Sequence, residues 1–176
     1  LVEKAQELKV YGNIGLAATY NEPMLNPDFL KTTFELAKEK GLKTVIVTSG
    51  AATLESLGKV LPVTDAFNID LKGFSEEFYN QAGGDFETVK AFIQKASGQA
   101  HVELTVLVIP GKNDSEEEME EMAKWIAGIS PDIPLHLSRY FPQYKCRIPM
   151  TPKETLYKLK AIAEKHLNYV YLGNVR

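Results

Sequence analysis

Short apolar runs alternate with longer amphipathic stretches along the whole chain. The apolar runs have the length and the β-branched and aromatic content of strands. They are Asn13–Thr19, Thr44–Thr48, Ala66–Leu71, His101–Ile109, Ile133–Leu137 and Tyr169–Leu172. The stretches between them carry apolar residues at three- and four-residue spacing, which is typical of helices packed on a sheet. The pattern predicts repeated β/α units built on a parallel sheet.

Capping signals mark the predicted helices. Asn26 is placed to cap a helix whose first turn contains Pro27, and Gly41 ends that helix. Two pairs fit the capping-box spacing, Ser115 with Glu118 and Thr151 with Glu154. The acidic run EEEMEE after Ser115 is interpreted as the first turns of a helix, where the dipole favours negative charge.

Helical spacing also predicts part of the core. The positions concerned are Met119, Met122, Trp125 and Ile126. The run LTVLVI is apolar on both faces, which favours a sheet covered by helices. Leu1–Leu8 has helical spacing without a preceding cap, so it is interpreted as a helix entered partway. No linker interrupts the pattern, and we expect one domain over residues 1–176.

Composition narrows the classes of partner. The net charge of -3 offers no long-range attraction for nucleic acid or anionic lipid, and no Lys/Arg cluster stands out. No apolar run is long enough to span a bilayer and no signal peptide is evident, so we expect a cytoplasmic protein. Cys146 is the one cysteine, which excludes an intramolecular disulfide and an all-cysteine zinc or iron-sulfur site within this chain.

Ligands of parallel α/β folds meet the carboxyl ends of the strands, so polar residues there are the candidates for chemistry. Asp70 and Lys72 lie two residues apart and should share one face, either as an internal ion pair or around a zwitterionic ligand. Glu22 before Pro23 either ends a strand or takes part in a site. His136 is either a satisfied core histidine or a ligand-binding residue. The segment PGKND follows the fourth predicted strand.

A set of motifs resembles one family. The segments are YNEP, DAFNIDLKGFSEEFY, HVELTVLVIPGKNDSEEE, SPDIPLHLSRYFPQYK and YVYLGNV. In this order they resemble the radical S-adenosylmethionine protein of the AmmeMemoRadiSam system, which is similar in turn to pyruvate formate-lyase activating enzyme. The resemblance covers essentially the whole chain. It implies a partial (β/α) TIM-like barrel that here lacks its first strand, because the CxxxCxxC loop that follows this strand is absent.

The resemblance also implies a cofactor site. Tyr20, Asn21 and Glu22 match the Gly-Gly-Glu position that binds the methionine amino group of S-adenosylmethionine, although Tyr and Asn depart from the two glycines. The other implied cofactor-binding residues are Thr48, Ser49, Asp70, Leu71, Lys72 and His136. Asp70, Leu71, Lys72 and His136 are expected around the methionine carboxylate and the ribose. Val108–Gly111 matches a strand end that packs against the adenine.

The implied reaction belongs to the full-length protein. A 4Fe-4S cluster, whose cysteine ligands this chain lacks, reduces S-adenosylmethionine to methionine and a 5′-deoxyadenosyl radical that abstracts hydrogen from a substrate. The implied partners are a glycyl radical enzyme or proteins of the AmmeMemoRadiSam system, with flavodoxin or ferredoxin as electron donor. Two alternatives stay open: a cofactor-free lyase or decarboxylase that uses Lys72 and Asp70, and a non-catalytic binding domain.

Overall fold

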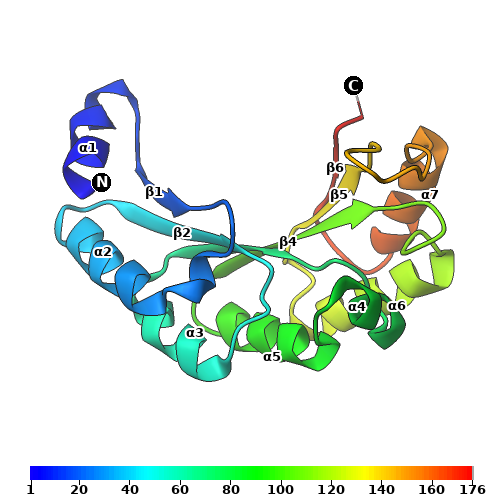
Figure 1. Cartoon of the computed structure of the whole chain (residues 1–176), viewed down its shortest axis with the longest axis horizontal. Helices are drawn as coiled ribbons and strands as arrows, with labels where there is room; N and C mark the ends of the chain where they lie inside the picture. Colours follow the sequence, from blue (N-terminus) through cyan, green and yellow to red (C-terminus); the bar gives the residue numbers. More distant parts are fainter. Residues whose placement is uncertain (176) are drawn as a thin grey trace. The chain divides into compact units, whose positions relative to one another are not determined.

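The computed structural model describes residues 1–175, which form two compact units. The first unit comprises Leu1–Ile69 and Glu87–Val102, and the second comprises Asp70–Phe86 and, of the described residues, 103–175. Strands and helices alternate in both units, which confirms the predicted α/β pattern (Figure 1).

The first unit contains three parallel strands and their helices. The strands are β1 (Gly15–Ala18), β2 (Lys43–Thr48) and β3 (Ala66–Asp70), and the helices are α1 (Val2–Glu7), α2 (Pro27–Glu39), α3 (Leu54–Val60) and α5 (Phe86–Ser97). Short 3-10 helices cover Leu8–Tyr11, Pro23–Leu25 and Leu61–Val63. β1 pairs with β2 and β2 with β3, so strand order follows chain order.

The second unit repeats this arrangement. Its strands are β4 (His101–Val108), β5 (Leu135–Arg139) and β6 (Val170–Gly173), and its helices are α4 (Glu76–Ala82), α6 (Glu116–Ile129) and α7 (Lys153–Ala163). β5 pairs in parallel with both β4 and β6. All six predicted strands are therefore confirmed, with their ends shifted by a few residues.

Each unit has a core between its strands and its helices. In the first unit α2, α3 and α5 lie on one side of the strands (Figure 1), and the rings of Phe67 on β3 and Phe92 on α5 meet edge to face at 5.9 Å. In the second unit Met119, Met122 and Ile126 are buried as predicted. This burial supplies most of the driving force for folding.

The parallel sheet that LTVLVI predicts is confirmed, since β4 pairs in parallel with β5. Its two faces differ, however, because side-chain exposure along β4 alternates. Val106 and Val108 are fully buried, whereas Leu107 is 43% exposed. Successive strand residues point to opposite faces, so only one face of β4 is packed in the core.

The predicted caps have mixed outcomes. The side chain of Asn26 accepts a hydrogen bond from Phe29 N, as expected of an N-cap. Ser115 caps α6 by accepting from Glu118 N, but the Glu118 carboxylate accepts from Phe74 N and does not complete the box.

The cap at Thr151 is wrong. The cap position of α7 is Pro152, and the buried Thr151 hydroxyl donates to Val108 O at 2.6 Å. A buried carbonyl needs a donor, and supplying one takes this hydroxyl away from the helix end.

No helix among residues 1–175 combines the length and the apolar content that crossing a bilayer requires.

Candidate functional site

The carboxylate of Glu22 is held at the carboxyl ends of β1 and β2. Its Oε1 accepts hydrogen bonds from the Thr48 hydroxyl at 2.6 Å and from Met24 N at 3.1 Å. Its Oε2 accepts from Ser49 N at 2.9 Å and from the Ser49 hydroxyl at 2.6 Å. Of the predicted site residues, the structure brings these three together: Glu22, Thr48 and Ser49.

These contacts determine the charge of Glu22. Partial burial alone raises the pKa of a carboxyl group, but hydrogen bonds from Ser49, Thr48 and Met24 hold the pKa of Glu22 below its ordinary value. All of these donors are neutral. Within residues 1–175 the structure thus has an ionised, half-buried carboxylate with no cationic side chain bound to it, which suits an ammonium group.

The two residues before Glu22 have an unusual backbone. Tyr20 has φ 57° and Asn21 has φ 48°, both in the left-handed region. A side chain there costs roughly 1–2 kcal/mol, and asparagine bears it better than tyrosine. Tyr20 is 92% exposed, so the packing of its ring does not offset this cost. Non-glycine residues thus adopt the backbone conformation that glycine adopts most easily.

Asp70 and Lys72 form an ion pair at the end of β3. Lys72 Nζ lies 3.2 Å from Asp70 Oδ2, and the two side chains are 46% and 44% exposed. The expectation that they share one face is therefore met, but the pair is not buried. Leu71 between them is fully buried and anchors the segment in the core.

Sequence reasoning assigned no role to Asn113, which supports this segment. Asn113 is 2% exposed, and its Nδ2 donates to Lys72 O at 2.6 Å and to Leu107 O at 2.9 Å. Its Oδ1 accepts from Ile109 N at 2.7 Å. PGKND contains several polar residues, and the pattern alone does not say which one turns inward.

His136 is partly buried on β5. Its Nε2 lies 2.7 Å from Glu103 Oε2, and its ring stacks on Tyr171 at 5.3 Å. These contacts make it a satisfied histidine, and its assignment to a cofactor site stays a prediction.

The described residues do not fit an iron-sulfur cluster. The sequence has the single cysteine Cys146, which is exposed, and residues 1–175 contain no group of three or more His, Cys, Asp or Glu side chains placed to hold a metal ion. The described residues therefore cannot supply the three cysteine ligands that such a cluster requires.

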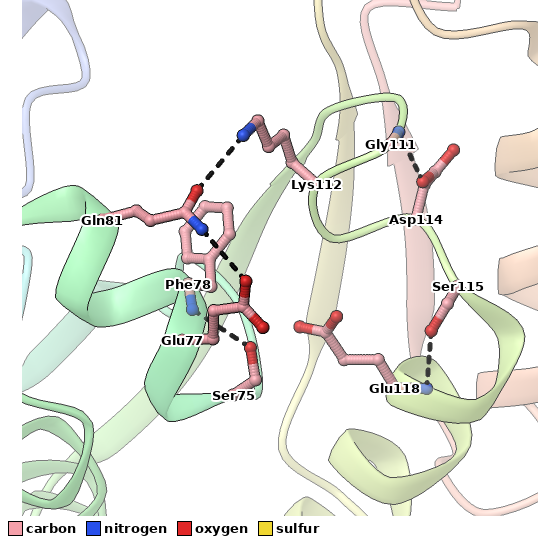
Figure 2. Close-up of a pocket in the computed structure, with 9 residues that line it drawn as sticks. All are labelled: Ser75, Glu77, Phe78, Gln81, Gly111, Lys112, Asp114, Ser115 and Glu118. Carbon is pink, nitrogen blue, oxygen red and sulfur yellow. Dashed lines mark hydrogen bonds between the residues drawn. The ribbon is translucent and has the colours of Figure 1, made fainter.

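A cavity of about 490 Å³ lies in the second unit between α4 and the loop that leads into α6. Figure 2 shows the carboxylates of Glu77 and Glu118 pointing toward one another in this cavity, with Lys112 near its rim. Burial raises the pKa of Glu118, Phe74 N opposes the change, and the charges of Glu121 and Asp114 add to it. The cavity lies beside the loop that carries Lys72, because Glu118 accepts from Phe74 N.

Comparison with known proteins decides the family. The Radical SAM superfamily profile matches residues 1–126, which is more than half of the chain. The chain belongs to the radical SAM superfamily. The superfamily is one of enzymes, and its members use S-adenosylmethionine with a 4Fe-4S cluster to generate a radical.

Relatives within the superfamily include activating enzymes. The chain is 36% identical over 169 residues to an uncharacterized protein of Methanocaldococcus jannaschii. The aligned region covers 94% of this chain and 50% of that protein. It is 23% identical over 168 residues to pyruvate formate-lyase 1-activating enzyme of Escherichia coli K12, covering 86% of this chain and 68% of the enzyme. The chain spans about half the length of the two relatives from Methanocaldococcus jannaschii.

A solved structure shows the same fold. A domain of pyruvate-formate lyase-activating enzyme from Bacteroides vulgatus aligns with a TM-score of 0.78 at 19% identity, covering 91% of this chain and 99% of that domain. The prediction of a radical SAM type of α/β fold is thereby confirmed. The narrower resemblance to the AmmeMemoRadiSam system stays a prediction.

Proposed function

We propose that this chain is the S-adenosylmethionine-binding part of a radical SAM enzyme, with Glu22 as the acceptor for the methionine amino group. The observation that carries the proposal is the Glu22 carboxylate, whose two oxygens accept from the neutral donors of Thr48, Ser49 and Met24, with no cationic side chain bound to it among residues 1–175. An ammonium group supplies the missing positive charge, and charge-assisted hydrogen bonds are the stronger kind.

Thr48 and Ser49 have a positioning task in this proposal. Their hydroxyls and the Ser49 N–H hold both carboxylate oxygens and keep the group ionised. The left-handed turn at Tyr20 and Asn21 brings the backbone into the conformation that places Glu22 after β1. Strain of this kind is maintained where the surrounding contacts over-determine it.

We propose that the second unit supplies two further cofactor-binding residues, Lys72 and Asp70. We assign the methionine carboxylate to the Lys72 ammonium and the ribose hydroxyls to the Asp70 carboxylate, because each pairing joins a donor to an acceptor. The existing ion pair does not block this. Its side chains are nearly half exposed, and an ion pair in such surroundings contributes at most about 1 kcal/mol.

When bound and reduced by one electron, S-adenosylmethionine would supply the radical that abstracts hydrogen from the substrate. The kind of substrate proposed for this chain is suggested by relatives that are activating enzymes. One of them is the (2S)-3-sulfopropanediol dehydratase activating enzyme of Klebsiella oxytoca, which is 26% identical over 115 residues. We propose a glycyl radical enzyme as the partner. Proteins of the AmmeMemoRadiSam system are the second candidate, and flavodoxin or ferredoxin is the proposed electron donor.

The rival lyase mechanism requires a neutral amine at Lys72. An amine becomes neutral near pH 7 when it is desolvated or lies beside another cation. The Lys72 side chain is 46% exposed and pairs with a carboxylate, so it is neither desolvated nor beside another cation. The geometry therefore favours the radical SAM proposal.

Isothermal titration of the chain with S-adenosylmethionine tests the proposal. We expect saturable binding that weakens at least tenfold in Glu22→Gln, with Glu39→Gln as the control because Glu39 is an exposed carboxylate of α2. Equal affinity in both variants, or no binding by the wild type, would contradict it.

A turnover test joins a segment with the CxxxCxxC motif to the N-terminal side of this chain and reconstitutes the protein anaerobically with iron and sulfide. We expect dithionite-dependent release of 5′-deoxyadenosine, and loss of this product when the cysteines of that motif are replaced.

A further inference from the structure

The loop after β3 is held by side chains that are distant in the sequence. The Tyr79 hydroxyl accepts from Lys72 N at 3.2 Å, and Asn113 Nδ2 donates to Lys72 O at 2.6 Å. Both backbone polar groups of Lys72 are therefore bound to side chains rather than to a neighbouring strand. The next backbone donor, Phe74 N, is bound by the Glu118 carboxylate.

The residue between these contacts has no room for a side chain. A Cβ at Gly73 would lie 2.8 Å from Phe78 Cδ1 and 3.2 Å from Glu118 Oε1. Contacts this short require a neighbour to move. The loop from Lys72 to Phe74 is thus held by hydrogen bonds from two of its N–H groups, by a hydrogen bond to one of its carbonyls, and by packing around Gly73.

Asn113 is the least replaceable of these supports. It is 2% exposed, and it joins the loop after β3 to the end of β4 by bonds to Lys72 O, Leu107 O and Ile109 N. Its removal takes the side-chain partner from three buried backbone groups. The direction in which the Lys72 side chain leaves the backbone depends on this support.

We infer that Asn113 is a positioning residue for the binding of the methionine carboxylate by Lys72. The inference rests on the proposed function, because it assumes that the Lys72 ammonium binds this carboxylate. Asn113 itself touches no part of the ligand in this scheme. It acts by fixing the backbone from which Lys72 projects. The Lys72 side chain then loses less conformational entropy when the ligand binds, and the affinity is higher.

Two ligands separate this role from general structural support. S-Adenosylmethionine has the carboxylate, and 5′-methylthioadenosine keeps the adenosine but lacks the carboxylate. Asn113 also accepts from Ile109 N, so Asn113→Ala should weaken both ligands, but we expect the affinity for S-adenosylmethionine to fall at least fivefold more than that for 5′-methylthioadenosine. Lys72→Met should give the same pattern. A loss that is equal for both ligands, or no loss for either, overturns the inference.

Further variants keep the test readable. Tyr79→Phe removes the hydroxyl that accepts from Lys72 N and should give the same selective loss at about threefold, so it replaces Asn113→Ala if that variant fails to fold. Thr64→Val removes a buried hydroxyl bound to Val60 O and should leave both affinities unchanged. If the wild type does not bind S-adenosylmethionine, the proposed function fails. If it binds and the variants show no selective loss, only the positioning role fails.

Discussion

Glu22 and Ser49 are joined by two hydrogen bonds to one carboxylate oxygen, from the Ser49 N–H at 2.9 Å and from its hydroxyl at 2.6 Å. The two residues are 27 positions apart in the sequence and lie at the ends of neighbouring parallel strands. The contact therefore links the strand ends where the site begins, and it holds the carboxylate in its charged form.

The Glu22 contacts predict the effect of removing the charge. In Glu22→Gln an amide NH₂ replaces one oxygen and faces the N–H and O–H donors of Thr48 or Ser49. We expect the free energy of unfolding to fall by about 1–3 kcal/mol, because buried donors lose their acceptor. Urea denaturation of this variant beside Glu39→Gln measures the difference, and a loss no larger than that of Glu39→Gln would sink the interpretation.

Asp65 predicts a pH dependence of stability. Partial burial alone raises its pKa, but bonds from Lys38, Thr44 and Lys43 hold the pKa at about 2, below the model-peptide value of 3.8. A lowered folded-state pKa stabilises the fold above about pH 4, and this stabilisation is lost as the pH falls toward about 2.

We expect Asp65→Asn to be about 1–2 kcal/mol less stable than the wild type at pH 7 and nearly equal to it near pH 2. Denaturation curves across this range measure the gap. Asp28→Asn, which removes an exposed pair with Lys59, is the control and should cost less than about 0.5 kcal/mol. A gap for Asp65→Asn that stays constant with pH would refute the assignment.

Gly73 and Gly58 predict opposite effects of the same substitution. Gly73→Ala places a methyl group against the Phe78 ring, so we expect a loss of about 1–3 kcal/mol. Gly58 lies inside α3 with no atom within 4 Å of an added Cβ, so Gly58→Ala should stabilise by about 0.5–1 kcal/mol. Equal changes in thermal denaturation would contradict the packing around Gly73.

The left-handed turn predicts a stabilising glycine. Tyr20 is 92% exposed with φ 57°, so Tyr20→Gly relieves backbone strain and loses no packing. We expect a gain of up to about 1 kcal/mol, because the entropy of glycine in the unfolded chain offsets part of the relief. Tyr11 is also exposed, at 85%, but lacks a positive φ, so Tyr11→Gly should destabilise. The same sign for both would argue against strain at Tyr20.

Local patterns were sufficient for the elements and for several site residues. Apolar runs predicted all six strands, because strand length and β-branched content are properties of adjacent residues. The cap at Asn26 is local for the same reason. Glu22 could be named in advance because polar residues after parallel strands lie at one edge, and Thr48 and Ser49 could be named through the family resemblance. Their mutual bonds could not, since these depend on strand register.

Tertiary structure decided which polar side chains form hydrogen bonds with which buried backbone groups. Thr151 has the sequence of a helix cap, yet its hydroxyl serves Val108 O, 43 positions earlier in the chain. Glu118 completes no capping box because Phe74 N, 44 positions earlier, takes its carboxylate. Asn113 supports Lys72 across 41 positions. The sequence by itself determined the order of strands and helices and the strand ends that carry polar residues. Only the folded structure selected the partners, because the cost of an unpaired buried donor or acceptor depends on which distant segments exclude water around it.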